Sequence, residues 1–299
     1  MLRKYLREDR HIFQMLFDGV IIGFISGGFS ILYRYLISMM NHYRELFYSS
    51  KEISTTVFLV VSLIVVIFIL DGLLKWAPLS GGSGIPQIHG EVMGVFKMEA
   101  FPTFVSKIIG GSLGNFAGFS LGREGPSIQI GGALAKFLAK ILKRDNDHTK
   151  FMITAGASAG LAAAFNAPIA GTVFAMEEIH KSFSRFVWIP CIIASVIANY
   201  LSFQILGHNM AFSFSVTQNL PMRLISLAFV IGLLTGVVGV IFNRGIVRAQ
   251  SFYQGISLPR WIKLGALIAL TFFVGKFFYS LTGGGHDLLE NFAFHQQPI

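Results

Sequence analysis

Long uncharged stretches recur along most of the chain and determine its predicted architecture. Four of them are close to or above the roughly 20 residues that a helix needs to cross a bilayer: Ile53–Leu70, Met152–Met176, Phe186–Gly207 and Leu224–Asn243. Two shorter runs add to these, Gly19–Tyr33 between Asp18 and Arg34, and Leu264–Gly275. The pattern predicts an all-α, polytopic membrane protein in which residues 1–299 form a single transmembrane domain without a soluble domain.

The composition supports this prediction and explains the charge. Of the 299 residues, 53% are hydrophobic and 13% are charged, and the mean hydropathy is +0.63, which argues against a water-soluble globule. The net charge of +9 could indicate a nucleic-acid partner. We assign it instead to cytoplasmic loops, because Lys and Arg concentrate at Arg3–Arg10, Lys140–Lys150 and Arg244–Lys263. Cys191 lies within an apolar run, where we expect a small core residue.

Two segments of the chain have weak copies later in the sequence. Ile22–Gly27 (IGFISG) is echoed by Ile231–Gly236 (IGLLTG), and Leu79–Gly82 (LSGG) is echoed by Leu281–Gly284 (LTGG). Chance similarity between glycine-rich helices is the alternative, but the order and spacing favour duplication. Duplicated halves are typical of secondary transporters, whose sites lie on broken helices at the repeat interface. We expect a first repeat at residues 16–203 and a second that starts at 223 and is incomplete at 299.

A glycine-rich segment, Gly82-Ser-Gly-Ile-Pro86, follows the apolar helix expected at Thr55–Lys75. It predicts a helix break at which Ser83 offers a hydroxyl and the glycine amides are free. Uncharged donors suit an anion such as chloride, which must bind and also leave. An ordinary interhelical turn explains the segment equally well.

A second segment, Gly122-Arg-Glu-Gly-Pro126, places a carboxylate in an apolar environment. Its glycines and Pro126 predict a turn that opens a helix, whose N-terminus favours an anion. Glu124 can occupy the anion position itself or leave it when protonated, and an intramembrane acid indicates a functional site. A structural ion pair with Arg123 is the alternative, which we consider poor because adjacent residues point apart on a helix.

A third segment, Asn166–Gly171, is followed by the paired acids Glu177 and Glu178. Pro168 is expected to end one helix and begin another, and Glu178 could serve as the inner acid of a proton relay. Lys107 either extends to the interface, our first interpretation, or raises the positive potential near the anion path. His89 is expected on a helix surface. No histidine spacing indicates a metal, and no catalytic pattern indicates an enzyme.

Taken together, GSGIP (Gly82–Pro86), GREGP (Gly122–Pro126) and AAAFNAPIAG (Ala162–Gly171) occur in an order that resembles the CLC family of chloride channels and chloride/proton exchangers. The resemblance implies that Ser83 binds the central chloride and that Glu124 is the gating and external proton-transfer glutamate. Glu178 matches the inner proton acceptor of exchangers. The resemblance and the predicted helix breaks together imply a chloride site formed by five residues: Ser83, Gly84, Ile85, Arg123 and Gly125.

The resemblance also implies a chloride/proton antiporter of the plasma or inner membrane, homodimeric as the full-length parent, with chloride and protons as its partners and no cofactor. Three alternatives remain: a passive, voltage-gated chloride channel, a fluoride exporter, and a non-transporting fragment. The family's later G-x-F-x-P turn and inner-gate tyrosine are absent from these residues. Gln87 and His89 stand where many bacterial relatives have acids, and we expect them to alter the intracellular vestibule.

Overall fold

The structure is a computed structural model that describes residues 2–207, 222 and 224–285, and no strand occurs among them. The α-helices are α1 (Leu2–Ser49), α2 (Ile53–Trp76), α3 (Ile85–Val92), α4 (Ala100–Phe116), α5 (Glu124–Ile141), α6 (Asn146–Phe165), α7 (Pro168–Phe174), α8 (Arg185–Leu206), α9 (Leu224–Gly255) and α10 (Arg260–Phe277). A π-helical segment, Ala175–His180, continues α7, and short 3-10 turns occupy Pro78–Ser80 and Tyr279–Leu281. The all-α prediction is confirmed.

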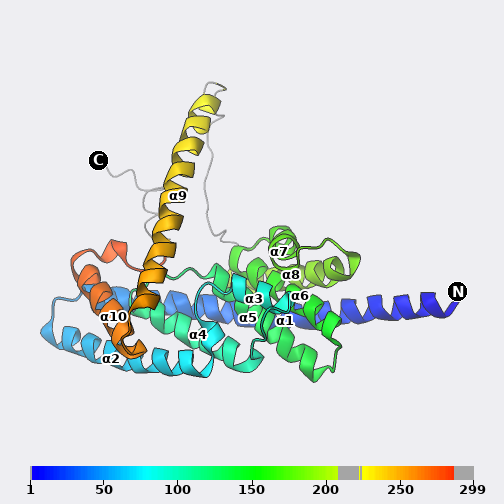
Figure 1. Cartoon of the computed structure of the whole chain (residues 1–299), viewed down its shortest axis with the longest axis horizontal. Helices are drawn as coiled ribbons and strands as arrows, with labels where there is room; N and C mark the ends of the chain where they lie inside the picture. Colours follow the sequence, from blue (N-terminus) through cyan, green and yellow to red (C-terminus); the bar gives the residue numbers. More distant parts are fainter. Residues whose placement is uncertain (1, 208–221, 223, 286–299) are drawn as a thin grey trace.

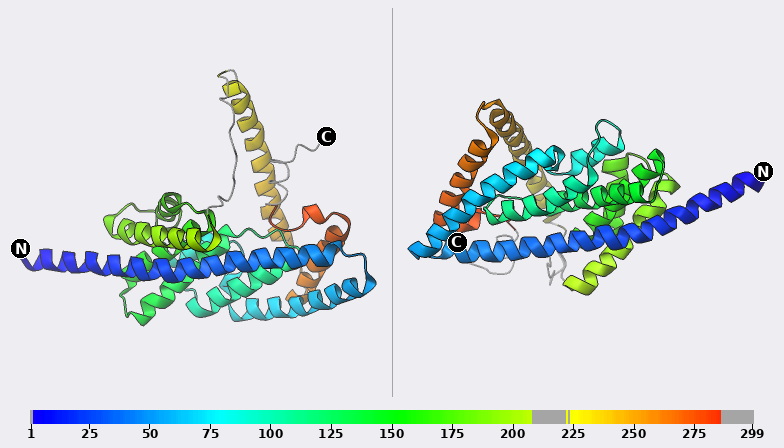
Figure 2. Two further views of the ribbon diagram at one scale, coloured as in Figure 1. Left: turned by 180° about the vertical axis from the view of Figure 1, so that it is seen from behind. Right: turned by 90° about the horizontal axis from the view of Figure 1, so that it is seen from below.

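Helix α1 runs along almost the full length of the molecule and contacts α2, α4, α5, α6, α8 and α10 (Figure 1). Helix α2 doubles back beside it, with α10 next to α2, and α5 and α6 occupy the centre (Figure 2). Helix α9 projects away from this body and buries none of its side chains against the described residues.

Glycines set the contact between α1 and α8. A Cβ atom at Gly23 would lie 2.8 Å from the Cβ of Ile197, and one at Gly27 would lie 2.7 Å from the Cβ of Ala198. These separations are shorter than side chains allow, so the four-residue spacing of small residues lets the two backbones approach closely. The abundance of glycine in the chain therefore has a packing cause at this contact.

Four described helices are long and apolar enough to cross a membrane: residues His11–Ser49 of α1, Ile53–Trp76, Arg185–Leu206 and Leu224–Gly255. The expected run Met152–Met176 is divided between helices. Helix α6 ends at Phe165, Asn166 adopts a left-handed conformation with φ of 56°, and Pro168 begins α7. The predicted break at Pro168 is confirmed, because proline cannot continue a helix but suits its first turn.

Asp18 bounds an uncharged run in the sequence, but it does not end a helix, because α1 continues through it. Its side chain is buried, and it accepts hydrogen bonds from Arg144 Nη2 at 2.7 Å and His148 Nε2 at 2.7 Å. These partners come from the α5–α6 connection and the first turn of α6. The buried carboxylate is tolerated because both its oxygens are paired, and it fastens α1 to that connection.

The backbone gives the sequence echo a structural counterpart. The residues that directly follow α2 and α10 have similar conformations: Ala77 has φ −132° and ψ 81°, and Phe278 has φ −138° and ψ 67°. A 3-10 turn follows each, and then a glycine with positive φ, Gly82 at 77° and Gly283 at 82°. The backbone thus pairs Gly82 with Gly283, whereas the sequence echo pairs Gly82 with Gly284, a difference of one residue. The repeat boundaries at 16–203 and 223–299 remain predictions.

Two of the basic clusters do not lie in loops as expected, because Arg3–Arg10 lies within α1 and part of the third cluster lies within α9. Arg244 and Arg248 lie within α9, which continues past the apolar run to Gly255, so they are not loop residues. The uncharged run ends at Asn243, but arginine is a good helix former and gives the backbone no reason to stop there.

Candidate functional site

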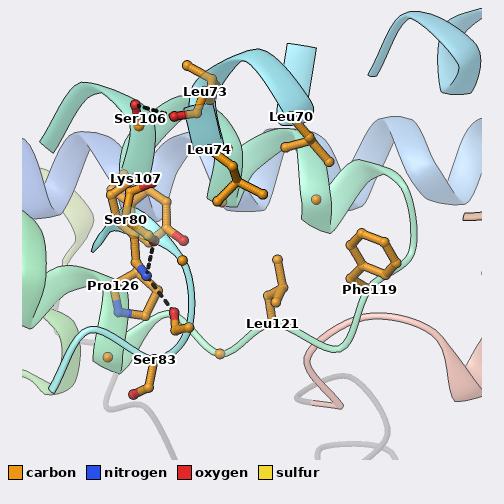
Figure 3. Close-up of a pocket in the computed structure, with 18 of the residues that line it drawn as sticks. Leu70, Leu73, Leu74, Ser80, Ser83, Ser106, Lys107, Phe119, Leu121 and Pro126 are labelled. Carbon is orange, nitrogen blue, oxygen red and sulfur yellow. Dashed lines mark hydrogen bonds between the residues drawn. The ribbon is translucent and has the colours of Figure 1, made fainter. Parts of the chain in front are cut away.

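A cavity of about 500 Å³ lies between α1, α2, α4, α10 and the first turn of α5. The polar residues along its wall are Tyr33, Ser80, Ser83, Ser106, Lys107, Ser120 and Glu124. Leucines of α2, together with Phe119 and Leu121, supply its apolar side, opposite Ser83 and Pro126 (Figure 3). A site of this kind, mostly apolar with a few converging polar groups, is typical of small-ligand binding.

Glycines bring the loop that carries Ser83 against the start of α5. Gly82 and Gly84 have φ of 77° and 108°, conformations that side chains disfavour. A Cβ atom at Gly84 would lie 2.8 Å from the Gly125 carbonyl oxygen, and one at Gly125 would lie 2.7 Å from Ser83 Oγ. Only glycine permits this approach, so the GSGIP and GREGP segments meet as one unit.

Gln87 has a structural role that the sequence did not indicate. Its Oε1 accepts a hydrogen bond from the Gly84 amide at 2.9 Å, and its Nε2 donates to the Gly81 carbonyl at 2.8 Å. The side chain therefore caps α3 and holds the Ser83 loop, and its effect on the intracellular vestibule stays a prediction. The expectation that the Gly84 amide is free is wrong, because that donor is already used.

Glu124 is the first residue of α5, as the glycine turn predicted. A Cβ atom at Gly122 would lie 2.9 Å from Glu124 Oε2, so this glycine leaves room for the carboxylate to fold back over the turn. Arg123 Nε lies 3.8 Å from Glu124 Oε1. Our rejection of this ion pair was wrong: although Arg123 has helical φ and ψ of −94° and −18°, the two charged groups come within ion-pair distance. The distance is too long for a hydrogen bond.

Lys107 is buried within α4 and does not extend to the interface, so our first interpretation was wrong. Its ammonium group donates to the Ser80 carbonyl at 3.0 Å and to the Gly82 carbonyl at 2.6 Å (Figure 3). These bonds satisfy the cation inside the protein and fix the backbone on both sides of Gly81. The side chain therefore holds the loop that carries Ser83 and brings a positive charge to the cavity wall.

Replacing Lys107 by methionine should lower the free energy of unfolding by about 2 kcal/mol, because two buried carbonyls lose a charged donor. Lys51→Met is the matched control, since that side chain is exposed between α1 and α2 and should contribute little. Thermal unfolding of the purified protein in detergent measures both variants. Equal unfolding temperatures for the two would contradict the assigned role of Lys107.

Glu178, which we expected to be the inner acid, is not among the residues that line the cavity. Glu178 belongs to the π-helical segment, is half exposed, and pairs with Lys181 Nζ at 3.2 Å. π-Helical turns often occur at functional sites. The same segment receives a hydrogen bond from another element, since His89 Nδ1 lies 2.9 Å from the Ile179 carbonyl. His89 is thus half-buried at the contact between α3 and this segment, and its expected position on a free helix surface is wrong.

Of the five residues expected at the anion site, Ser83 and Gly125 line the cavity with Glu124, whereas Gly84, Ile85 and Arg123 are not among its described lining residues. Tyr33 and Ser120 were missed. Tyr33 ended an apolar run and gave no sign that α1 turns it inwards, and Ser120 had no motif of its own beyond its place before GREGP. Within the described residues, no group of three or more His, Cys, Asp or Glu could hold a metal ion.

The chain is similar to known proteins over most of its length. Residues 68–299 match the family model described as voltage gated chloride channel. The H(+)/Cl(−) exchange transporter ClcA of Salmonella arizonae is 30% identical over 305 residues, a match that covers 97% of this chain and 63% of the relative. The chain thus spans less than two thirds of the length of the curated relatives it matches.

Solved structures also resemble this chain. A slow cyanobacterial Cl−/H+ antiporter superposes with a TM-score of 0.83 at 26% identity, covering 95% of this chain and 68% of that one. A CLC-type fluoride/proton antiporter gives a TM-score of 0.80 at 22% identity, covering 96% of this chain and 71% of the other, which supports the fold alone. With the apolar helices described above, these matches confirm a multi-pass protein of the cell membrane. The chain belongs to the voltage-gated chloride channel (CLC) family.

Proposed function

We propose that the protein exchanges chloride for protons across the membrane and that Glu124 couples the two movements. The observation that carries the proposal is that a carboxylate and a hydroxyl, Glu124 and Ser83, line one cavity at the start of a helix. An anion in that cavity gains from the helix N-terminus and from the charge of Lys107. An ionised Glu124 competes with it for the same positive potential.

The coupling follows from this competition. When Glu124 is ionised, its negative charge disfavours chloride; when it takes a proton, the penalty disappears and chloride enters. The two ligands therefore favour each other's binding, and by thermodynamic linkage the effect is reciprocal. A carboxylate that shares the anion's cavity thus explains an exchange in which neither ion moves freely without the other.

Glu178 is proposed as the inner proton acceptor. It lies on a different element from Glu124, does not line the described cavity, and is half exposed, so it can take up or release a proton in water. Lys181, its ion-pair partner, is also half exposed, so the pair stays in contact with water. In this scheme protons pass between Glu124 and Glu178, whereas chloride uses the cavity at Ser83. We propose a homodimer for the whole protein, as the family resemblance implies.

Paired flux measurements test the proposal. The protein, expressed from its whole reading frame, is placed in lipid vesicles under a chloride gradient without a proton gradient, and both ions are followed. We expect chloride efflux to drive protons in the opposite direction. Chloride flux without proton movement would identify a passive channel. Proton movement driven by fluoride but not by chloride would identify a fluoride exporter, and no flux of any of these ions would contradict transport.

A further inference from the structure

Tyr33 carries a polar group that the fold does not use. Its side chain is fully buried on α1, with its ring in the apolar core that includes Ile37, Phe104 and Ile108. Among the residues that the structure describes, its hydroxyl has no hydrogen-bond partner. A buried hydroxyl without a partner costs free energy, and a phenylalanine would bury the same ring without that cost. The hydroxyl therefore calls for an acceptor that these residues do not provide.

The position of the hydroxyl indicates where that acceptor lies. Tyr33 lines the same cavity as Ser83, Lys107 and Glu124. Gly111 of α4, another lining residue, leaves the space that the hydroxyl occupies, because a Cβ atom there would overlap Tyr33 Oη. The absence of a side chain at position 111 thus keeps the O–H group at the cavity wall. It adds an uncharged donor to a cavity that already holds a cation and a serine hydroxyl.

We propose that Tyr33 is a positioning residue for the transported anion and donates its hydroxyl proton to a chloride ion in this cavity. The inference rests on the proposed function and adds a ligand to it. A phenolic O–H is a neutral donor, and donation to an ion is stronger than donation to a neutral acceptor. The nearby charge of Lys107 attracts the anion, and the hydroxyl fixes where it stops.

Chloride binding to the full chain in detergent tests this proposal. Sodium gluconate is exchanged for sodium chloride at constant ionic strength, and binding is measured by titration calorimetry for the wild type, Tyr33→Phe and Tyr35→Phe. Tyr35 lies on the same helix with an exposed side chain outside the cavity, so its variant is the matched control. We expect Tyr33→Phe to weaken chloride binding about tenfold, the effect of one hydrogen bond to an ion, and Tyr35→Phe to leave it unchanged.

A stability measurement separates lost binding from misfolding. In gluconate, Tyr33→Phe should unfold at or above the wild-type temperature, because it removes an unpaired polar group from the core. Chloride should then raise its unfolding temperature less than that of the wild type. A variant that unfolds earlier than the wild type in gluconate, yet gains equally from chloride, would overturn the proposal.

Two further variants decide between possible acceptors. If Tyr33 serves the Glu124 carboxylate instead of chloride, Tyr33→Phe will have no effect in a Glu124→Ala background, and the proposal is wrong; a persistent effect supports it. If Ser83→Ala weakens chloride binding but Tyr33→Phe does not, the Tyr33 inference fails while the proposed function stands. If the wild type itself binds no chloride, both fail.

Discussion

Replacing Gly131 by alanine should strongly destabilise the fold. Gly131 of α5 faces Gly156 of α6, and a Cβ atom at either position would overlap the carbonyl oxygen of the other. A backbone carbonyl inside a helix cannot rotate away, so the two helices must separate. Helix α1 also joins this contact through a hydrogen bond from Ser26 Oγ to the Gly131 carbonyl at 3.1 Å.

The expected cost is about 3 kcal/mol, the upper end of the usual range for overpacking, because the obstacle is backbone and not a flexible side chain. A protein stable by roughly 5–15 kcal/mol loses a large share of its margin in this way. Thermal unfolding and size-exclusion chromatography in detergent measure the loss. Gly72→Ala on the exposed side of α2 is the control, since nothing lies within 4 Å of its added methyl group and alanine favours a helix. Equal behaviour of both variants would contradict the packing argument.

The sequence was sufficient for features that depend on neighbouring residues. Pro168 predicted the end of one helix and the start of the next, because the effect of proline on the backbone is local. The GREGP segment likewise predicted a helix that begins near Glu124. Apolar runs predicted the spans at α2, α8 and α9, since length and hydropathy alone decide whether a helix suits a bilayer.

Features that depend on distant residues were not predictable in the same way. Asp18 bounds an uncharged run, and its burial is possible because of Arg144 from the α5–α6 connection and His148 from α6. Lys107 looked long enough to reach the interface, yet two carbonyls of the Ser83 loop bind it inside. In each case a charge is tolerated in the interior because of partners that are remote in the sequence. A single sequence does not reveal such partners.

The site shows the same division. The motifs predicted that Ser83, Glu124 and Gly125 act together, and the structure lines one cavity with all three. The sequence did not show which backbone amides remain free to bind an anion, because the Gly84 amide already donates to the side chain of Gln87, three residues later. Glycines serve here mainly to let two loops touch, so a glycine motif predicts close approach better than it predicts which donors remain free.

Glu124→Gln should abolish proton transport while chloride flux persists. The amide has nearly the shape of the protonated carboxyl group, so it leaves the cavity open to the anion, but it cannot release a proton. Chloride binding should also lose its pH dependence. In the wild type, chloride and the proton on Glu124 favour each other, so affinity falls as pH rises; in the variant, that competing charge is absent at every pH.

Paired flux in vesicles and chloride titrations at several pH values measure both effects, with Glu99→Gln as the control. Glu99 is exposed at the start of α4, away from the cavity, and its neutralisation should change neither ion's movement. Glu178→Gln should also stop protons, but it should leave the pH dependence of chloride binding intact, because Glu178 does not line the anion's cavity. Continued proton transport by Glu124→Gln would remove the basis of the coupling scheme, since the remaining acid would then suffice alone.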